Sequence, residues 1–284
     1  MRQRPPAGRR LDGHRPGPVS RPAIPPEVVR LAEDSNAYQP LGPDEERVVT
    51  DRYVLFFGSI AHPAANAAQR LRLDPANVDS TVREVRSAVR HRGLDGFTWE
   101  VSSSSTPPDL VDRLMALGMA PFEEPLAVAM VLAAAPPPAP PEVEVRTVRT
   151  PDELRIGRAI AAEAFGADPG GEGSDEPAPP TEAELAGEPR RQYLAYLEGE
   201  PVATAWATFT QHGVILNGGS TLPPARGRGA YRALVAARWD DAVARGTPAL
   251  VTQAGAMSRR ILRRLGFEEV AQIRILMDHA DRPT

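Results

Sequence analysis

Short apolar segments separated by turn residues dominate the C-terminal part of the chain. Three of them are joined by the short turns Glu198-Gly-Glu-Pro201 and Gln211-His-Gly213, which predicts an antiparallel meander. Thr150-Pro151-Asp152-Glu153 is a capping box with proline at the first helical position, and it begins a helix that runs to about Phe165. The other predicted elements are strands over 143–148, 191–197, 201–210, 214–222, 249–253 and 270–278, helices over 229–245 and 258–265, and a short helix capped by Thr181-Glu-Ala-Glu184.

Fewer elements are predicted for the N-terminal part of the chain. We expect strands over 48–57, 97–101 and 126–132 and a helix over 79–91. A further helix is expected to run to about Leu117, with Thr106 as its N-cap and Pro107 at its first position.

The two parts share an order of elements. Each has a helix, a strand, a helix that ends in Leu-Gly-apolar, and a final strand, with Leu117-Gly118-Met119 matching Leu265-Gly266-Phe267. This repeat predicts duplicated domains, although any two segments that alternate helix and strand share such a rhythm. We place a disordered Arg- and Pro-rich tail at 1–25, a first domain at 26–133, a Pro-rich linker at 134–142 and a second domain at 143–284.

Composition limits the chemistry. The 284 residues carry a net charge of −4, which gives no global attraction to nucleic acid or membranes, and binding of nucleic acid by the arginine-rich tail remains a minor alternative. Cysteine is absent and the five histidines are scattered, so we expect no disulfide and no metal site. No apolar run is long enough to span a bilayer and no signal peptide is recognisable, which predicts a cytoplasmic protein.

The segment with the clearest chemistry joins the meander to the helix over 229–245. Arg226-Gly-Arg-Gly229 combines a glycine turn, two positive charges and a helix N-terminus, which together favour an anion. The sequence matches neither a P-loop nor a dinucleotide-binding turn, because it lacks Gly-Lys-Ser/Thr and follows antiparallel strands. Gly218-Gly219 in the preceding strand predicts a bulge that separates neighbouring strands. A plain structural turn is the alternative for such a glycine pattern.

Residues 143–278 resemble the GCN5-related N-acetyltransferase superfamily. Arg226-Gly227-Arg228-Gly229-Ala230 is similar to the family's pyrophosphate loop, Leu222-Pro223 to its entry, and the segment from Ser258 to Phe267 to its second motif. The resemblance implies an α/β fold with a mixed, mostly antiparallel sheet flanked by helices, and acetyl-CoA or another acyl-CoA as co-substrate. It also implies a small-molecule or peptide amine acceptor that attacks the thioester directly. The first domain lacks the glycine loop and resembles a degenerate copy.

The family pattern assigns the acyl-CoA site to the loop and to the end of the strand before it. The implied residues are Thr221, Leu222, Arg226, Gly227, Arg228, Gly229, Ala230 and Tyr231. The sequence departs from the pattern in three places: Tyr231 replaces a small residue, Gly255 stands where an Asn is common, and Leu262-Arg-Arg-Leu265 carries no tyrosine as general acid.

Two further residues are catalytic candidates. Asn217 could position a water molecule, and Ser258 could bond the thiolate, while each also fits an ordinary strand or N-cap role. We therefore expect an N-acetyltransferase, with a non-catalytic acyl-CoA sensor as the alternative. The oligomeric state, including a homodimer, is left open.

Overall fold

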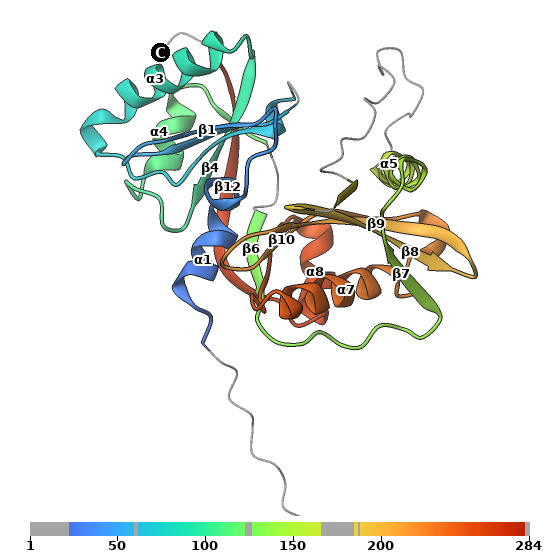
Figure 1. Ribbon diagram of the computed structural model, residues 1–284. Coiled ribbons are helices and arrows are strands. Elements are labelled where there is room, and N and C mark those ends of the chain that lie inside the picture. Colours follow the sequence, from blue (N-terminus) through green and yellow to red (C-terminus); the bar gives the residue numbers. More distant parts are fainter. Residues whose placement is uncertain (1–22, 60–61, 123–126, 166–184, 187, 282–284) are drawn as a thin grey trace, which may run out of the picture.

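The computed structural model describes residues 23–59, 62–122, 127–165, 185–186 and 188–281. In these residues all strands join one sheet with the order β1-β2-β3-β4-β12-β6-β11-β10-β9-β8-β7, and β5 pairs with β12 (Figure 1). The predicted disordered tail at 1–25 falls almost wholly outside the described residues, and the predicted helix cap at 181–184 falls wholly outside them. In the described part of the chain, no helix combines the length and the apolar character needed to cross a membrane.

The N-terminal half, residues 23–132, places two helices over one face of its strands. Apolar side chains of α3 and α4 pack with those of β2 and β4 into a buried cluster that includes Val82, Leu114 and Trp99. The elements of this half are α1 (Pro26–Glu33), α2 (Ser35–Tyr38), β1 (Glu46–Val49), β2 (Val54–Phe57), β3 (Asn66–Gln69), α3 (Val78–His91), β4 (Gly96–Ser102), α4 (Leu110–Ala116), β5 (Ala120–Pro121) and β6 (Ala127–Leu132).

The C-terminal half, residues 143–281, contains the predicted meander as β8, β9 and β10. Helix α5 contacts β8, β9 and β10, and α7 contacts the same strands from the opposite face (Figure 1). The elements are β7 (Val143–Thr147), α5 (Pro151–Phe165), β8 (Arg190–Leu197), β9 (Glu200–Phe209), β10 (Val214–Thr221), α7 (Ala230–Ala244), β11 (Leu250–Ala254), α8 (Ala256–Arg264) and β12 (Glu268–His279).

The two halves exchange their last strands. β6, which ends the N-terminal half, pairs antiparallel with β11 of the other half, and β12 pairs antiparallel with β4. The two exchanged strands also pair with each other along Ala127–Val131. In Figure 1 the red strand β12 accordingly runs among the blue and green strands of the N-terminal half. The sheet is therefore continuous across the linker that separates the halves in sequence.

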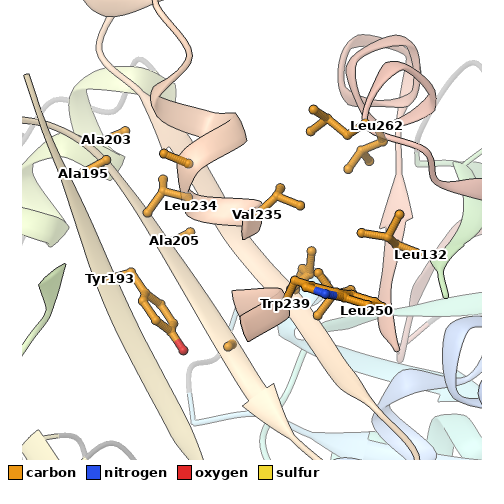
Figure 2. Close-up of a cluster of buried hydrophobic side chains, with 14 of the residues drawn as sticks. Leu132, Tyr193, Ala195, Ala203, Ala205, Leu234, Val235, Trp239, Leu250 and Leu262 are labelled. Carbon is orange, nitrogen blue, oxygen red and sulfur yellow. The ribbon is translucent and has the colours of Figure 1, made fainter. Parts of the chain in front are cut away.

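Side chains follow the strands across this junction. Leu132 lies among Leu234, Trp239, Leu250 and Leu262 of the C-terminal half, in the main cluster shown in Figure 2. In the opposite direction, Leu276 of β12 is buried in the core of the N-terminal half. Each hydrophobic core therefore depends on a strand that the other half supplies.

The predicted elements agree with the structure where local signals are strong. The capping box forms as expected: Glu153 N–H donates to Thr150 Oγ1 (3.2 Å), and Thr150 N–H donates to Glu153 Oε2 (3.0 Å). The strand expected over 48–57 is instead the hairpin of β1 and β2, with Thr50 N–H bonded to Tyr53 O across its turn (3.0 Å).

The helix cap expected at Thr106 does not form, because α4 begins at Leu110. Thr106 N–H donates to Leu71 O and its carbonyl accepts from Leu73 N–H, both at 3.1 Å. Backbone pairing with a distant segment therefore overrides the local preference for a cap at this residue.

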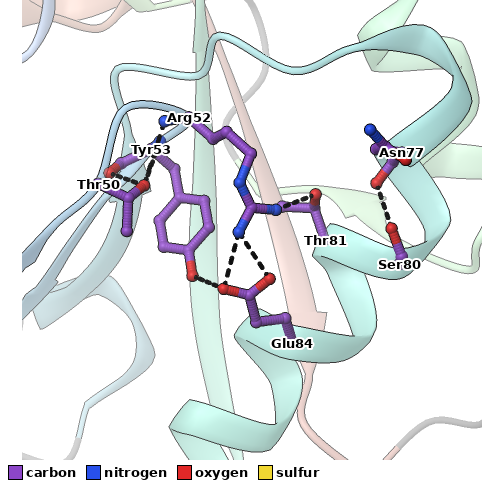
Figure 3. A network of polar contacts seen from close by, with 7 residues as sticks. All are labelled: Thr50, Arg52, Tyr53, Asn77, Ser80, Thr81 and Glu84. Atoms are coloured by element: carbon purple, nitrogen blue, oxygen red, sulfur yellow. Dashed lines mark hydrogen bonds and ion pairs between the residues drawn. The ribbon is translucent and has the colours of Figure 1, made fainter.

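A polar network fastens the β1–β2 hairpin to α3 (Figure 3). Arg52 pairs with Glu84 (2.8 Å) and donates to Thr81 Oγ1 (2.9 Å), while the hydroxyl of Tyr53 donates to Glu84 Oε1 (2.5 Å). The Tyr53 hydroxyl and Arg52 hold the pKa of Glu84 below its ordinary value, and burial raises the pKa of Tyr53 to about 12. The charged form of Glu84 therefore stabilises the folded state.

We expect Glu84→Gln to reduce the free energy of unfolding by about 0.5–1 kcal/mol at pH 7, because the pair is partly exposed. A lowered folded-state pKa contributes stability above the ordinary carboxyl pKa and loses it as the pH falls. The deficit should therefore shrink below about pH 4. Urea unfolding at several pH values measures it, and Ser80→Ala on the same helix is the control that should show no such dependence. A deficit of Glu84→Gln that does not change with pH would contradict this explanation.

Candidate functional site

The parallel strands β10 and β11 pair over only two residues. Val214 pairs with Leu250 and Ile215 with Val251, and beyond this point no described strand pairs with that edge of β10. Thr252 Oγ1 donates to Leu216 O (3.2 Å) where the strands part. The backbone of β10 beyond Leu216 is therefore an open strand edge.

The predicted bulge lies on this open strand. The register between β9 and β10 shifts between Asn217 and Ser220, and Gly218 adopts a φ of 56°. A side chain at Gly219 would bring a Cβ within 2.7 Å of Tyr231 Cε2. The glycine pair thus permits both the bulge and the close packing of the Tyr231 ring beneath it.

A groove of about 1360 Å³ occupies the gap between the strands. β10 and β11 form its walls, the turn before α7 lies at one end, and α8 contributes Ser258, Ile261 and Leu262. The N-terminal half contributes Ala32 and Ser35, and the linker contributes Pro140. Both halves and the linker therefore line one groove.

The turn at the end of the groove presents backbone amides. A 3₁₀ turn over Pro223–Ala225 leads into Gly227 (φ 80°) and Gly229 (φ 89°), and α7 starts at Ala230. The first amides of a helix have no acceptor within the helix, and the helix dipole adds partial positive charge there. Gly227 is exposed with no heavy atom within 4 Å of the place of a Cβ, whereas a Cβ on Gly229 would lie 2.4 Å from Pro140 Cγ.

Two arginines place full charges beside the turn. Arg226 donates to Thr221 O (3.3 Å) and to Ala164 O (3.4 Å), and Arg228 pairs with Glu198 (2.5 Å). Both arginines are exposed, so a ligand could compete for their guanidinium groups without unfolding the turn. The turn has the donors and charge that bind a phosphate or pyrophosphate group.

The structure brings most of the residues predicted from sequence into this groove. Thr221, Arg226, Gly227, Arg228, Gly229, Ala230, Tyr231, Asn217 and Ser258 all line it. Leu222 instead packs its side chain against the cluster under α5, and its N–H donates to Val202 O (2.9 Å). Ser258 Oγ donates to Gly255 O (3.3 Å), while Asn217 is exposed at the bulge.

One groove residue that the sequence analysis did not single out is Arg238 of α7. It is 1% exposed, donates to Leu234 O (2.9 Å) and to Trp206 O (3.1 Å), and leaves Nη2 without a partner among the described residues. Trp206 pairs with Asn217, so the guanidinium lies beside the bulge. Burial lowers the pKa of Arg238. The sequence signal that could have indicated this residue is a single arginine within the apolar run Leu234-Val-Ala-Ala-Arg-Trp239.

The corresponding gap in the N-terminal half is closed. β3 and β4 also pair in parallel at only two positions, Ala67 with Thr98 and Ala68 with Trp99, but residues 71–73 and Thr106 then bridge the strands. The helix that follows, α3, carries Asp79 in its first turn, and Asp74 caps the short 3₁₀ turn before it. Negative charge at this helix N-terminus disfavours a phosphate.

Comparison with known proteins identifies the fold. No family model and no curated protein matches the chain. A GCN5-related N-acetyltransferase from Kribbella flavida is 23% identical, with a TM-score of 0.67 over 88% of this chain and 95% of that one. One from Sphaerobacter thermophilus is 18% identical, with a TM-score of 0.56 over 83% and 82%. A tandem GNAT protein from the clavulanic acid biosynthesis pathway is 16% identical, with a TM-score of 0.54 over 93% and 90%.

These likenesses extend over both halves, and the chain has the fold of the GCN5-related N-acetyltransferases in a tandem arrangement. The resemblance drawn from the sequence motifs is thereby confirmed for the fold. The mixed, mostly antiparallel sheet flanked by helices is likewise the predicted fold class.

Proposed function

We propose that this chain, which has the tandem fold of the GCN5-related N-acetyltransferases, transfers an acyl group from acyl-CoA to an amine. The observation that carries the proposal is a glycine turn with helix N-terminal amides at the end of an open strand edge, with a bulge further along the same strand. Acyl-CoA has groups that match these features in the same order. Its pyrophosphate would lie at the turn, its pantetheine amides along the strand edge, and its thioester near the bulge.

The groove residues fit such a substrate. The amides of Gly229, Ala230 and Tyr231 would hold the pyrophosphate, with Arg226 and Arg228 adding charge. Backbone groups of β10 between Leu216 and the turn would pair with the pantetheine amides as a strand would. Because Leu222 N–H is already bonded to Val202 O, this pairing is expected to involve Thr221 and the residues before it.

The transfer requires only a well-placed amine and a site for negative charge. The nitrogen lone pair attacks the thioester carbonyl carbon, a C–N bond forms, and the C–S bond breaks with its electron pair left on sulfur. The proton lost by nitrogen ends on that sulfur, so the products are an amide and CoA with a free thiol. Alignment of two reactants can contribute about 7–11 kcal/mol toward the barrier.

Three groove residues can assist this step. Arg238 supplies positive charge beside the bulge, where negative charge develops on the thioester oxygen and sulfur. Ser258 faces the groove from α8 and could turn its hydroxyl from Gly255 O to the thiolate. Asn217, exposed on the bulge, could hold a water molecule that relays the amine proton.

A non-catalytic acyl-CoA sensor is the second candidate. It is favoured by the apolar groove lining from α8 and its C-cap, where Ile261, Leu262 and Leu265 lie and no tyrosine is present. The bridge between Arg72 and Thr106 also closes the gap between β3 and β4, where a second site of the same kind would lie.

Binding and turnover distinguish these functions. We expect saturable acetyl-CoA binding by calorimetry, and acetyl-CoA-dependent thiol release with at least one of spermidine, putrescine, tryptamine, glucosamine and a lysine dipeptide. Binding without release across these amines and succinyl- or propionyl-CoA would favour the sensor. Failure of CoA and all three acyl-CoA compounds to bind would contradict both candidates.

A further inference from the structure

The groove reaches the face of the sheet that α1 covers. Along β11, Leu250 joins the core under α7, whereas Val251 packs with Ala32 of α1 on the other face. Side chains alternate along a strand, so Gln253 lies on the α1 face with Val251. Gln253, Ala32 and Ser35 line the groove there. The side of the groove away from α7 is thus built jointly by the C-terminal half and by α1 and α2.

Hydrogen bonds fix the orientation of the Gln253 amide. Its Nε2 donates to Glu33 O (3.1 Å) and to Glu100 Oε2 (3.2 Å). A backbone carbonyl oxygen can only accept, and so can the oxygen of an ionised carboxylate. The amino group must therefore face them. The amide oxygen accepts no hydrogen bond from any residue in the described part of the chain, so it is the group that Gln253 offers to a ligand in the groove.

Glu100 is a buried carboxylate that the N-terminal half supplies to this arrangement. It lies on β4 and is 8% exposed. It is the cross-strand partner of Ile275 on the exchanged strand β12, and both face the α1 side of the sheet. Gln69 Nε2 also donates to Glu100 Oε2, and Asn36 N–H donates to Gln69 Oε1 (3.0 Å), which fixes that amide as well. Two oriented amides therefore hold one carboxylate oxygen.

The electrostatic surroundings of Glu100 are predominantly acidic. Burial raises its pKa to about 7 despite the donors Gln69 and Gln253, and nearby Asp34, whose own pKa burial raises to about 6, adds to the effect. Glu33 stands beside Asp34 at the end of α1 and accepts from Ser104 Oγ (3.1 Å). The positive groups Arg70 and Arg72 follow β3, where they act on Asp34. A hydrogen-bond acceptor backed by buried carboxylates favours a donor that carries positive charge.

We infer that Gln253, held in place by Glu100, accepts a hydrogen bond from the nitrogen of the acceptor, and that the acceptor is a primary amine that is cationic at neutral pH and loses one proton to solvent before its lone pair attacks. This inference rests on the proposed acyltransferase function and deepens it. In it Gln253 contacts the substrate, whereas Glu100 is a positioning residue that acts through Gln253. The N-terminal half then contributes to the reaction in the other half through the junction of the exchanged strands.

The test compares three variants in acetyl transfer to spermidine and to butylamine, with calorimetric acetyl-CoA affinity as a second readout. Gln253→Leu should raise KM for the amine at least tenfold, because a hydrogen bond to a charged group is worth about 1.5–3 kcal/mol. Glu100→Leu should do the same by releasing Gln253. Acetyl-CoA affinity should stay within threefold in both. Gln272→Leu, an exposed glutamine on β12, is the matched control and should change neither value.

The variant Glu100→Gln separates the effect of the negative charge of Glu100 from its role in orienting Gln253. Its amide oxygen can accept from Gln69 and Gln253 as the carboxylate does, so it should recover most of the KM lost in Glu100→Leu. The free-amine fraction grows with pH equally in both proteins, so the two are compared as a ratio. The ratio of kcat/KM in the wild type to kcat/KM in Glu100→Gln should increase through about pH 7, as Glu100 ionises. A merely structural role for Glu100 would not alter the pH profile.

The outcomes of the inference and of the proposed function can be told apart. If the wild type acetylates amines and Gln253→Leu keeps the wild-type KM and pH profile, the inference is overturned while the acyltransferase function stands. If acetyl-CoA binds but neither amine is acetylated, the same variants are compared for calorimetric spermidine binding. Equal spermidine affinity in wild type and Gln253→Leu, or none in either, then overturns the inference as well.

Discussion

Replacing Asp278 by alanine is expected to lower the free energy of unfolding by about 3–5 kcal/mol, the range for removing one partner of a buried ion pair. Asp278 and Arg86 are 0% and 1% exposed and lie 2.9 Å apart, and Trp99 Nε1 also donates to Asp278 (3.0 Å). Arg86 belongs to α3, and Asp278 lies near the end of the exchanged strand β12. The variant leaves a guanidinium buried without its carboxylate and weakens the hold on β12.

Urea unfolding, followed by circular dichroism and by tryptophan fluorescence, measures this loss. Asp281→Ala changes an exposed acid three residues further on and should leave stability within about 0.5 kcal/mol. The double variant Arg86→Met with Asp278→Leu removes both charges and should recover part of the stability, because apolar residues tolerate the same burial. Equal stability of Asp278→Ala and the wild type would exclude the pair as an anchor of β12.

Gly227→Glu is expected to weaken acyl-CoA binding at least a hundredfold. The site of its side chain is open, so a larger residue fits, and the added carboxylate would stand in the turn that is proposed to hold the pyrophosphate. Apposed like charges cost several kcal/mol, and about 1.4 kcal/mol corresponds to each factor of ten in affinity. Gly229 is less suitable for this test, because any Cβ there meets Pro140.

Gly227→Gln is the matched control for that variant. The glutamine side chain has nearly the same size as glutamate but carries no charge. Both variants place a non-glycine residue at a φ of 80°, so both have the same backbone strain. Calorimetry with acetyl-CoA should find its affinity within about tenfold of the wild type, and the two variants should unfold at similar urea concentrations. Equal affinities for the glutamate and glutamine variants would refute the assignment of the turn to the pyrophosphate.

The features that the sequence predicted correctly depend on neighbours in the chain. Thr150 and Glu153 are three residues apart and cap their own helix, and Gly218-Gly219 permits a bulge whatever the surrounding fold. The glycine turn before α7 is local in the same sense. Such signals need only a few consecutive residues, which explains why the cap, the bulge and the glycine turn could be predicted from the sequence.

The features that could not be predicted depend on distant partners. The apolar pattern of β6 and β12 shows that each is a buried strand, but it fits a partner in either half equally well. Thr106 carries a good cap signal that backbone pairing with residues 71–73 overrides. Gln253 and Glu100 are 153 positions apart, and only the exchanged strands bring them together. The sequence therefore could not show that these two residues meet on the α1 side of the groove.

The exchange of β6 and β12 also determines what would happen to a chain cut in the linker. Each fragment would expose the unpaired edge of its own sheet and carry a strand made for the other fragment, a combination that promotes aggregation. In the intact chain the two pieces meet at an effective concentration on the order of millimolar, set by the tether rather than by the amount of protein present. The linker thus makes the association of the two halves intramolecular, so dilution of the protein cannot separate them.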